Sequence, residues 1–250
     1  MGGIWVYPYI EVINRATRAC TIKHVNQGFI DYLCFYEPDI IVLQIGIVDC
    51  WIRENGKQFV SKGEFFNSMN GIVDLLKKRP NGQMIIVGIC PTSEKMESRY
   101  PEINQEINFY NNIYKQFLNE KQIHFIDMEQ FIKSTAISTY LLPDDQHINP
   151  NGNKLVATEV IKIVNSYIYN ELGTKCFNDE DFKTAFNFFE KAYEKYNGNL
   201  DNLYNYILLL IENNNIVKLR NVLDSLKTNK FDKELMELIG IANKIIQSGN

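Results

Sequence analysis

The chain has 250 residues, 45% of them hydrophobic, which is typical of a globular protein with one α/β domain and a smaller companion. Its formal net charge of −4 gives no electrostatic reason to expect nucleic acid or an anionic membrane as a partner. No apolar run approaches the roughly 20 residues of a membrane span, and the first residues lack a signal-peptide pattern, so a cytoplasmic location is expected. The five cysteines are odd in number and lack metal-ligand spacing, which favours reduced thiols and predicts neither disulfides nor a metal site.

Strand and helix patterns alternate up to about residue 168. Two runs rich in Ile and Val, at 38–46 and 83–90, predict strands that are buried on both faces of a sheet, and residues 122–128 predict a third strand. Helices are predicted at 21–36, 62–78, 100–120 and 151–173. The buried side of the last one is expected to consist of Leu155, Val156, Val160, Ile161, Ile163 and Val164. Because hairpin turns are lacking, the connections should be crossovers, which predicts a flavodoxin-like, three-layer α/β/α fold with a parallel sheet. Residues 4–14 predict one further short strand.

From about Tyr169 onward only helices are predicted. The spacing of a tetratricopeptide repeat is present in Tyr169, Leu172, Gly173, Cys176, Ala185, Phe189 and Ala192. One period later the apolar pattern persists without the small residues, in Leu203, Tyr206, Leu219, Leu223 and Leu226. A plain helical hairpin has the same periodicity. We therefore expect two domains, residues 1–168 and 169–250. No flexible linker separates them, so one helix should continue across a rigid junction.

The segment 141–152, LLPDDQHINPNG, carries the strongest functional signal. Asn149 can cap a helix whose first position is Pro150, which leaves Asp144 and His147 in the preceding loop. A carboxylate that orients an imidazole is half of a nucleophilic catalytic site. We therefore predict that His147 is a general base and that Asp144 orients it. Asp145 competes for the second role, but the three-residue offset favours Asp144.

In the order of its motifs the chain resembles the SGNH (GDSL-type) hydrolase family, over about residues 5–170. The matching positions are Asp144 and His147 for the Asp-x-x-His block, Gly46–Asp49 for the Gly-x-Asn-Asp block, and Asn14, Ala16 and Thr21 for the Asn-x-Gly block with its later Thr. The resemblance implies an esterase or deacetylase that needs no cofactor and acts on O-acyl groups. Because the chain is most similar to small bacterial members of the family, the acylated substrate is expected to be a cell-surface carbohydrate. It also implies that Ala16 and Gly46 lie where the oxyanion and substrate bind.

Two departures from the family bear on activity. The family's nucleophile block, Gly-Asp-Ser, occurs nowhere in the sequence, so the serine is either lost or supplied upstream of Met1. Val48 stands where the family has an Asn that donates a hydrogen bond to the oxyanion. Loss of one such donor costs about 2.7–4 kcal/mol, whereas loss of the serine costs roughly a factor of a million in rate. The serine therefore decides whether the chain is an enzyme.

Other side chains near the matched blocks could compensate or have structural roles. Arg15, Arg18 and Arg53 could bind an oxyanion or an acidic sugar, although surface arginines fit the pattern equally well. Ser93 and Ser98 follow the second main strand without a nucleophile motif. His24 and His124 are expected to be structural, and Asp49 is expected to cap or brace the loop after its strand.

Two classes of function remain open from the sequence. The first is the ester hydrolase. The second is a hydrolase-derived binding or scaffold protein whose C-terminal helices hold a protein partner. A nucleotide-binding domain is disfavoured, because no glycine-rich phosphate loop follows any strand. If the family's first strand is missing, the strand at 11–14 should pair with 38–46. The sheet would then be partly uncovered and prone to dimerise, unless Ile4–Tyr7 fills the gap.

Overall fold

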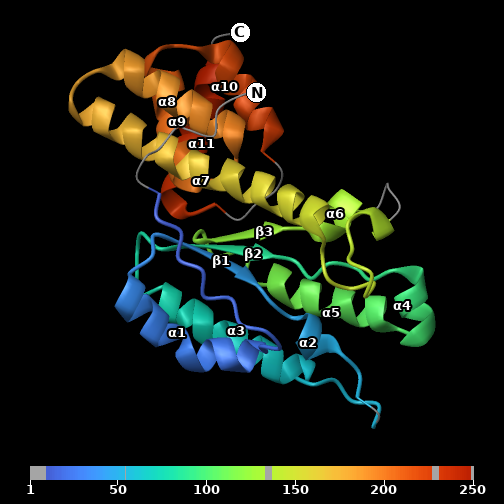
Figure 1. Ribbon diagram of the computed structural model, residues 1–250. Coiled ribbons are helices and arrows are strands. Elements are labelled where there is room, and N and C mark those ends of the chain that lie inside the picture. Colours follow the sequence, from blue (N-terminus) through green and yellow to red (C-terminus); the bar gives the residue numbers. More distant parts are fainter. Residues whose placement is uncertain (1–9, 54, 133–136, 227–230, 249–250) are drawn as a thin grey trace.

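A small parallel sheet lies at the centre of the α/β part of the computed structural model, which describes residues 10–53, 55–132, 137–226 and 231–248 (Figure 1). Its strands are β1 (Ile40–Gln44), β2 (Gln83–Val87) and β3 (Ile123–Ile126), in the order β1-β2-β3. Both pairs are parallel, with Val42 opposite Ile85 and Ile85 opposite His124. The three predicted strands, and the crossovers between them, are confirmed.

Helices occupy every connection between the strands. Helix α1 (Ile22–Tyr36) precedes β1; α2 (Ile47–Cys50) and α3 (Lys62–Leu76) follow it, and α4 (Glu94–Arg99) and α5 (Ile103–Lys115) follow β2. After β3 come α6 (Met128–Ile132), a short 3-10 helix (Ile137–Thr139) and α7 (Pro150–Asn178). The expected helices at 21–36, 62–78 and 100–120 are thus present with shorter bounds.

The sheet has a helical layer on each face (Figure 1). On one face Leu43, Met84, Ile86 and Ile123 share a buried core with apolar side chains of α1, α3 and α5. On the other, Ile85, Val87 and Ile126 pack with side chains of α7. Since alternate residues of β2 belong to different cores, both of its faces are covered. This is the three-layer α/β/α arrangement that the sequence predicts.

The side of the sheet formed by β1 is less covered than predicted. Val42 is 48% exposed, although the apolar run predicted burial on both faces. The strand predicted at 11–14 is wrong, because residues 10–17 have no strand pairing and Val12 is 83% exposed. A strand without a ladder partner or a buried face gains too little to form. The expectation for Ile4–Tyr7 lies outside the described residues.

The chain ends in a group of packed helices (Figure 1). Helix α7 starts one residue before the predicted 151–173 helix and continues without a break past residue 168, the expected domain boundary. Its Ile161 side chain is exposed, although burial was expected. It packs on α8 (Phe182–Lys195), which is followed by α9 (Leu200–Glu212), α10 (Ile216–Ser225) and α11 (Lys233–Ser248). A Cβ on Gly173 would lie 2.5 Å from the Phe189 ring, so α7 and α8 approach as closely as the small residue permits. The tetratricopeptide assignment stays a prediction. No described helix is long and apolar enough to cross a membrane.

A buried polar cluster joins β3 to the helices that follow it. The His124 ring lies 2.8 Å (Nε2) from the Tyr167 hydroxyl and 3.1 Å (Nδ1) from the Tyr196 hydroxyl. Tyr167 in turn donates to Gln83 Oε1 at 2.9 Å. Both imidazole nitrogens of His124 are therefore occupied by hydrogen bonds within the fold, which agrees with a structural role.

Candidate active site

The loop before α7 is closed by backbone hydrogen bonds. Leu141 and Ile148 form an antiparallel bridge, and the Leu142 N–H donates to the His147 carbonyl at 2.7 Å. The predicted cap is present: Asn149 Oδ1 accepts from the N–H groups of Asn151 (2.8 Å) and Gly152 (3.1 Å). A side chain that receives two of the helix's unpaired N–H groups fixes where α7 begins. The residues between 142 and 147 are therefore held as a short, closed loop.

Gly152 lets this loop lie directly against the first turn of α7. A Cβ at this position would come within 2.9 Å of both the Tyr140 carbonyl oxygen and Ile148 Cβ. Real Cβ atoms do not approach backbone oxygens so closely. The glycine of the NPNG sequence is thus required by the packing of the loop.

Asp144 and His147 form a hydrogen-bonded pair inside this loop. Asp144 Oδ2 lies 2.7 Å from His147 Nδ1, and Asp144 Oδ1 accepts the backbone N–H groups of Gln146 (3.1 Å) and His147 (3.0 Å). Their side chains are 43% and 58% exposed. Within the described residues Nε2 of His147 has no hydrogen-bond partner. The structure thus brings the two predicted residues together with Nε2 open to a ligand.

The protonation of the pair follows from these contacts. Partial burial acts to raise the pKa of Asp144, but the hydrogen bonds from the His147 and Gln146 backbone and from the His147 ring outweigh it and lower that pKa. An ionised carboxylate only accepts hydrogen bonds, so the neutral His147 ring carries its proton on Nδ1. Nε2 is then the unprotonated nitrogen, which is the arrangement of a general base.

Asp145 contacts a different part of the protein. Its carboxylate pairs with Lys95 Nζ at 2.9 Å, and its carbonyl accepts the Ser93 N–H at 3.1 Å. Asp144 rather than Asp145 is thus the partner of His147, as the spacing predicts. Because Ser93 and Lys95 lie just after β2, these contacts also place the loop at the carboxyl end of the sheet, where doubly wound folds bind ligands.

The Gly46–Asp49 block forms the turn after β1 and the short helix α2. Gly46 has a φ of 120°, and a Cβ there would lie 2.5 Å from Ile89 Cδ1, so only glycine fits. Asp49 is fully buried: Oδ1 accepts the Ile22 N–H at 2.9 Å, and Oδ2 has no partner among the described residues. Burial raises its pKa to about 6. Asp49 therefore caps helix α1, rather than the loop after its own strand.

Ala16 and Arg15 both make contacts within the fold, and their roles towards an oxyanion or substrate stay predictions. The Ala16 N–H donates to Asn14 Oδ1 at 3.0 Å, so it is already used within its own turn. The Arg15 guanidinium lies 5.8 Å from the Tyr32 ring centre and 5.5 Å from that of Tyr36. These rings belong to the last turns of α1, about 20 Å along the helix from the end that Asp49 caps. Arg15 therefore stacks on aromatic rings near the opposite end of α1.

The remaining predicted side chains are either exposed or bonded within their own segments. Arg18 is exposed in the turn that leads into α1. Arg53 donates from Nη2 to the Phe59 carbonyl at 3.1 Å and lies 4.3 Å from the centre of the Phe59 ring, so it braces its own loop. Ser98 donates to the Glu94 carbonyl within α4. His24 contacts Thr21 at the start of α1, which agrees with a structural role.

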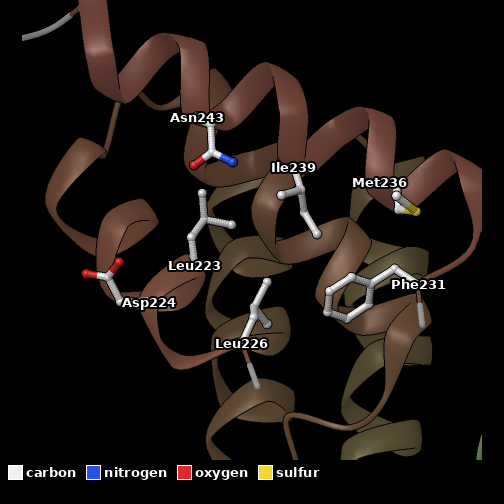
Figure 2. A pocket seen from close by; sticks show the side chains of 7 residues that line it. All are labelled: Leu223, Asp224, Leu226, Phe231, Met236, Ile239 and Asn243. Atoms are coloured by element: carbon white, nitrogen blue, oxygen red, sulfur yellow. The ribbon is translucent and has the colours of Figure 1, made fainter. Parts of the chain in front are cut away.

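Two cavities in the described part of the chain lie away from His147. One, of about 570 Å³, runs along β3 and is bordered by α5, α7 and the turn after α8. The other, of about 290 Å³, lies between α10 and α11, where Phe231, Met236 and Ile239 face Leu223 and Leu226 (Figure 2). No group of three or more His, Cys, Asp or Glu side chains in the described ranges could hold a metal ion. The candidate site therefore rests on the Asp144–His147 geometry.

Two structural contributors were missed by the sequence analysis. Lys95 has no motif around it, and only the fold brings it to Asp145. Asn111 is buried on α5, where its side chain accepts the Ile89 N–H (2.8 Å) and donates to the Ile89 carbonyl (3.0 Å). The one available signal was a polar residue on an otherwise apolar helix face, which indicates a buried hydrogen bond. Asn111 fixes the chain as it leaves β2.

Residues 8–155 match the model of the GDSL-like Lipase/Acylhydrolase family. A solved structure, that of LAE5, an alpha/beta hydrolase enzyme from the metagenome of Lake Arreo, Spain, is similar with a TM-score of 0.46 and 16% identity. The similarity covers 56% of this chain and 66% of that one. The search of curated proteins gives no match.

Proposed function

The chain belongs to the GDSL-like lipase/acylhydrolase family, and we propose that it removes O-acyl groups by a serine mechanism in which His147 is the general base. The observation that carries the proposal is the 2.7 Å contact between Asp144 Oδ2 and His147 Nδ1, with Nε2 open. Acyl-ester hydrolysis is the chemistry of the family. An O-acylated carbohydrate of the cell surface is the substrate class implied by the resemblance.

In the proposed reaction Nε2 of His147 takes the proton of a serine hydroxyl as its oxygen attacks the acyl carbon. Asp144 keeps the ring in the Nδ1–H tautomer and stabilises the imidazolium that forms. The tetrahedral intermediate then expels the alcohol, which receives the proton from Nε2. Water, activated by the same nitrogen, releases the acyl group as a carboxylate.

The nucleophile is the part of the proposal that the described residues do not supply. Ser93 accepts the Met96 N–H and is buried, and Ser98 is bonded to its own helix, so neither is placed against His147. We place the serine in a Gly-Asp-Ser segment that precedes these residues. The less covered side of the sheet at β1 is a suitable position for it, because the strand end there adjoins the Gly46 turn.

Hydrolysis of p-nitrophenyl acetate by a chain extended upstream through such a segment tests the proposal. His147→Ala should lower kcat by at least about a thousandfold, and Asp144→Asn by roughly ten thousandfold, because the ring tautomer is lost. Pro143→Ala is the matched control, since Pro143 is exposed in the same loop. Turnover that is indifferent to His147→Ala, or no turnover at all, would eliminate the proposal.

A second candidate is a hydrolase-derived binding protein. The observations that favour it are the Ala16 N–H, which is already bonded to Asn14, and Val48, whose side chain cannot donate to an oxyanion. In that case the C-terminal helices hold a protein partner. The genomic sequence upstream separates the candidates: an in-frame Gly-Asp-Ser favours the enzyme, and a stop codon shortly before Met1 favours the binding protein.

A further inference from the structure

Asp145 adopts a backbone conformation that its side chain alone does not favour. Its φ is 65°, in the left-handed region that glycine occupies most easily. A turn that needed only this conformation would be served better by glycine. The carboxylate, however, pairs with Lys95 Nζ at 2.9 Å and lies near the Ser93 hydroxyl, which helps to lower the pKa of Asp145. The strained position is thus combined with two side-chain contacts to another loop.

Ser93 is a fixed point in the structure. It is buried, caps α4, and its hydroxyl oxygen accepts the Met96 N–H at 3.1 Å. Its own N–H donates to the Asp145 carbonyl at 3.1 Å, so the backbone of Ser93 holds Asp145 in place. Ser93 follows β2, whose residues are all buried. The contacts therefore tie the His147 loop to the segment that follows the fully buried strand β2.

We propose that Asp145 is a positioning residue, which clamps the loop through Ser93 and Lys95 and thereby holds the His147 Nδ1–H against Asp144. The inference deepens the proposed function and rests on it for its catalytic meaning. Its reason is geometric: Asp144 and His147 are both substantially exposed, so their pairing depends on the course of the loop rather than on packing around the rings. Asp145 fixes that course between the two. The same contacts, from Lys95 first and then Ser93, lower the pKa of Asp145.

The ring tautomer of His147 measures this positioning without reference to activity. Long-range ¹H–¹⁵N spectra of the full chain, at a pH where the ring is neutral, give the ratio of Nδ1–H to Nε2–H forms. The His147→Ala spectrum assigns the signals. We expect Nδ1–H to dominate in the wild type and its ratio to Nε2–H to fall roughly tenfold in Asp145→Gly, because hydrogen bonds to a charged group are lost. Ser93→Ala should act in the same direction.

Asp145→Gly also relieves the left-handed backbone conformation, which offsets part of the lost contacts, so the variant should still fold. Glu180→Gly is the matched control: Glu180 has a φ of 63° but lies between α7 and α8, and its replacement should leave the tautomer ratio unchanged. Lys95→Arg should preserve the ratio and Lys95→Met should lower it. An unchanged ratio in Asp145→Gly overturns the inference. A wild-type ring without Nδ1–H preference overturns the Asp144–His147 pair itself, and a shifted ratio without any esterase activity overturns only the proposed function.

Discussion

The buried His124 cluster makes the stability of the fold depend on pH. Tyr167 donates to Gln83, so its oxygen accepts the His124 Nε2–H, and Nδ1 accepts from Tyr196. A neutral imidazole has one donor and one acceptor, which this arrangement uses completely. Burial lowers the pKa of His124 to about 4, from an ordinary value of 6.5. Protonation therefore opposes folding.

The sign and size of the effect follow from linkage. In the unfolded chain His124 binds a proton below about pH 6.5, whereas in the folded protein it does so only near pH 4. The stability contributed by the neutral ring is thus complete above pH 6.5 and is lost as the pH falls towards 4. Between pH 7 and pH 5 the folded protein should lose about 2 kcal/mol from this one group.

Urea unfolding at pH 7 and pH 5, for the wild type and for His124→Gln, measures this contribution. Other groups titrate as well, so the quantity of interest is the difference between the two proteins in their loss of unfolding free energy. It should be about 2 kcal/mol, with His124→Gln less sensitive to acid. Equal acid sensitivity of the wild type and His124→Gln would refute the reasoning.

Two further substitutions, Gly152→Ala and Asp49→Asn, test the packing of the loop and the effect of a buried carboxylate. Gly152→Ala should lower the free energy of unfolding by about 1–3 kcal/mol, because its Cβ meets the Tyr140 carbonyl at 2.9 Å. Gly240→Ala is the control, because a Cβ at this position of α11 would have no other atom within 4 Å. It should raise the free energy of unfolding by up to about 1 kcal/mol. Thermal melts of both variants measure these changes. Asp49→Asn keeps an acceptor for the Ile22 N–H but removes a buried charge. Because the folded pKa of Asp49 is raised to about 6, wild-type stability is lost as the pH rises from 3.8 through 6. Asp49→Asn should therefore gain roughly 1–3 kcal/mol relative to wild type between pH 4 and pH 8, and an equal difference at both pH values would contradict this.

The parts of the fold that the sequence predicts are those determined by local patterns. β2 is apolar from Met84 to Val87 and is buried along its whole length. The Asn149–Pro150 pair begins a helix because cap and first-turn preferences depend on neighbouring residues only. The contact of Asp144 with His147 is similarly local, since three residues and one closed loop determine it.

The wrong predictions concern long-range contacts. Val12 and Ile13 form too short an apolar pair to show whether a strand partner exists, and both side chains lie exposed. The Arg15 guanidinium lies against aromatic rings of α1, a contact that no sequence pattern predicts, and its role towards a substrate stays a prediction. The same reason hid the contact of Asp145 with Lys95, which joins two loops that are 50 residues apart in the chain.

Helix α7 links the candidate site to the C-terminal helices. Its first residues complete the loop of His147, its middle packs Val156 and Ile163 on the sheet, and its last turns pack Gly173 against Phe189. Helix α7 has 29 residues and is therefore about 44 Å long. It connects the sheet and the C-terminal helices without an intervening linker. Tyr167, on the same helix, adds the bond to His124. Because the two cores bury different lengths of one helix, the C-terminal helices help to hold α7 on the sheet, and through α7 they support the loop that presents His147.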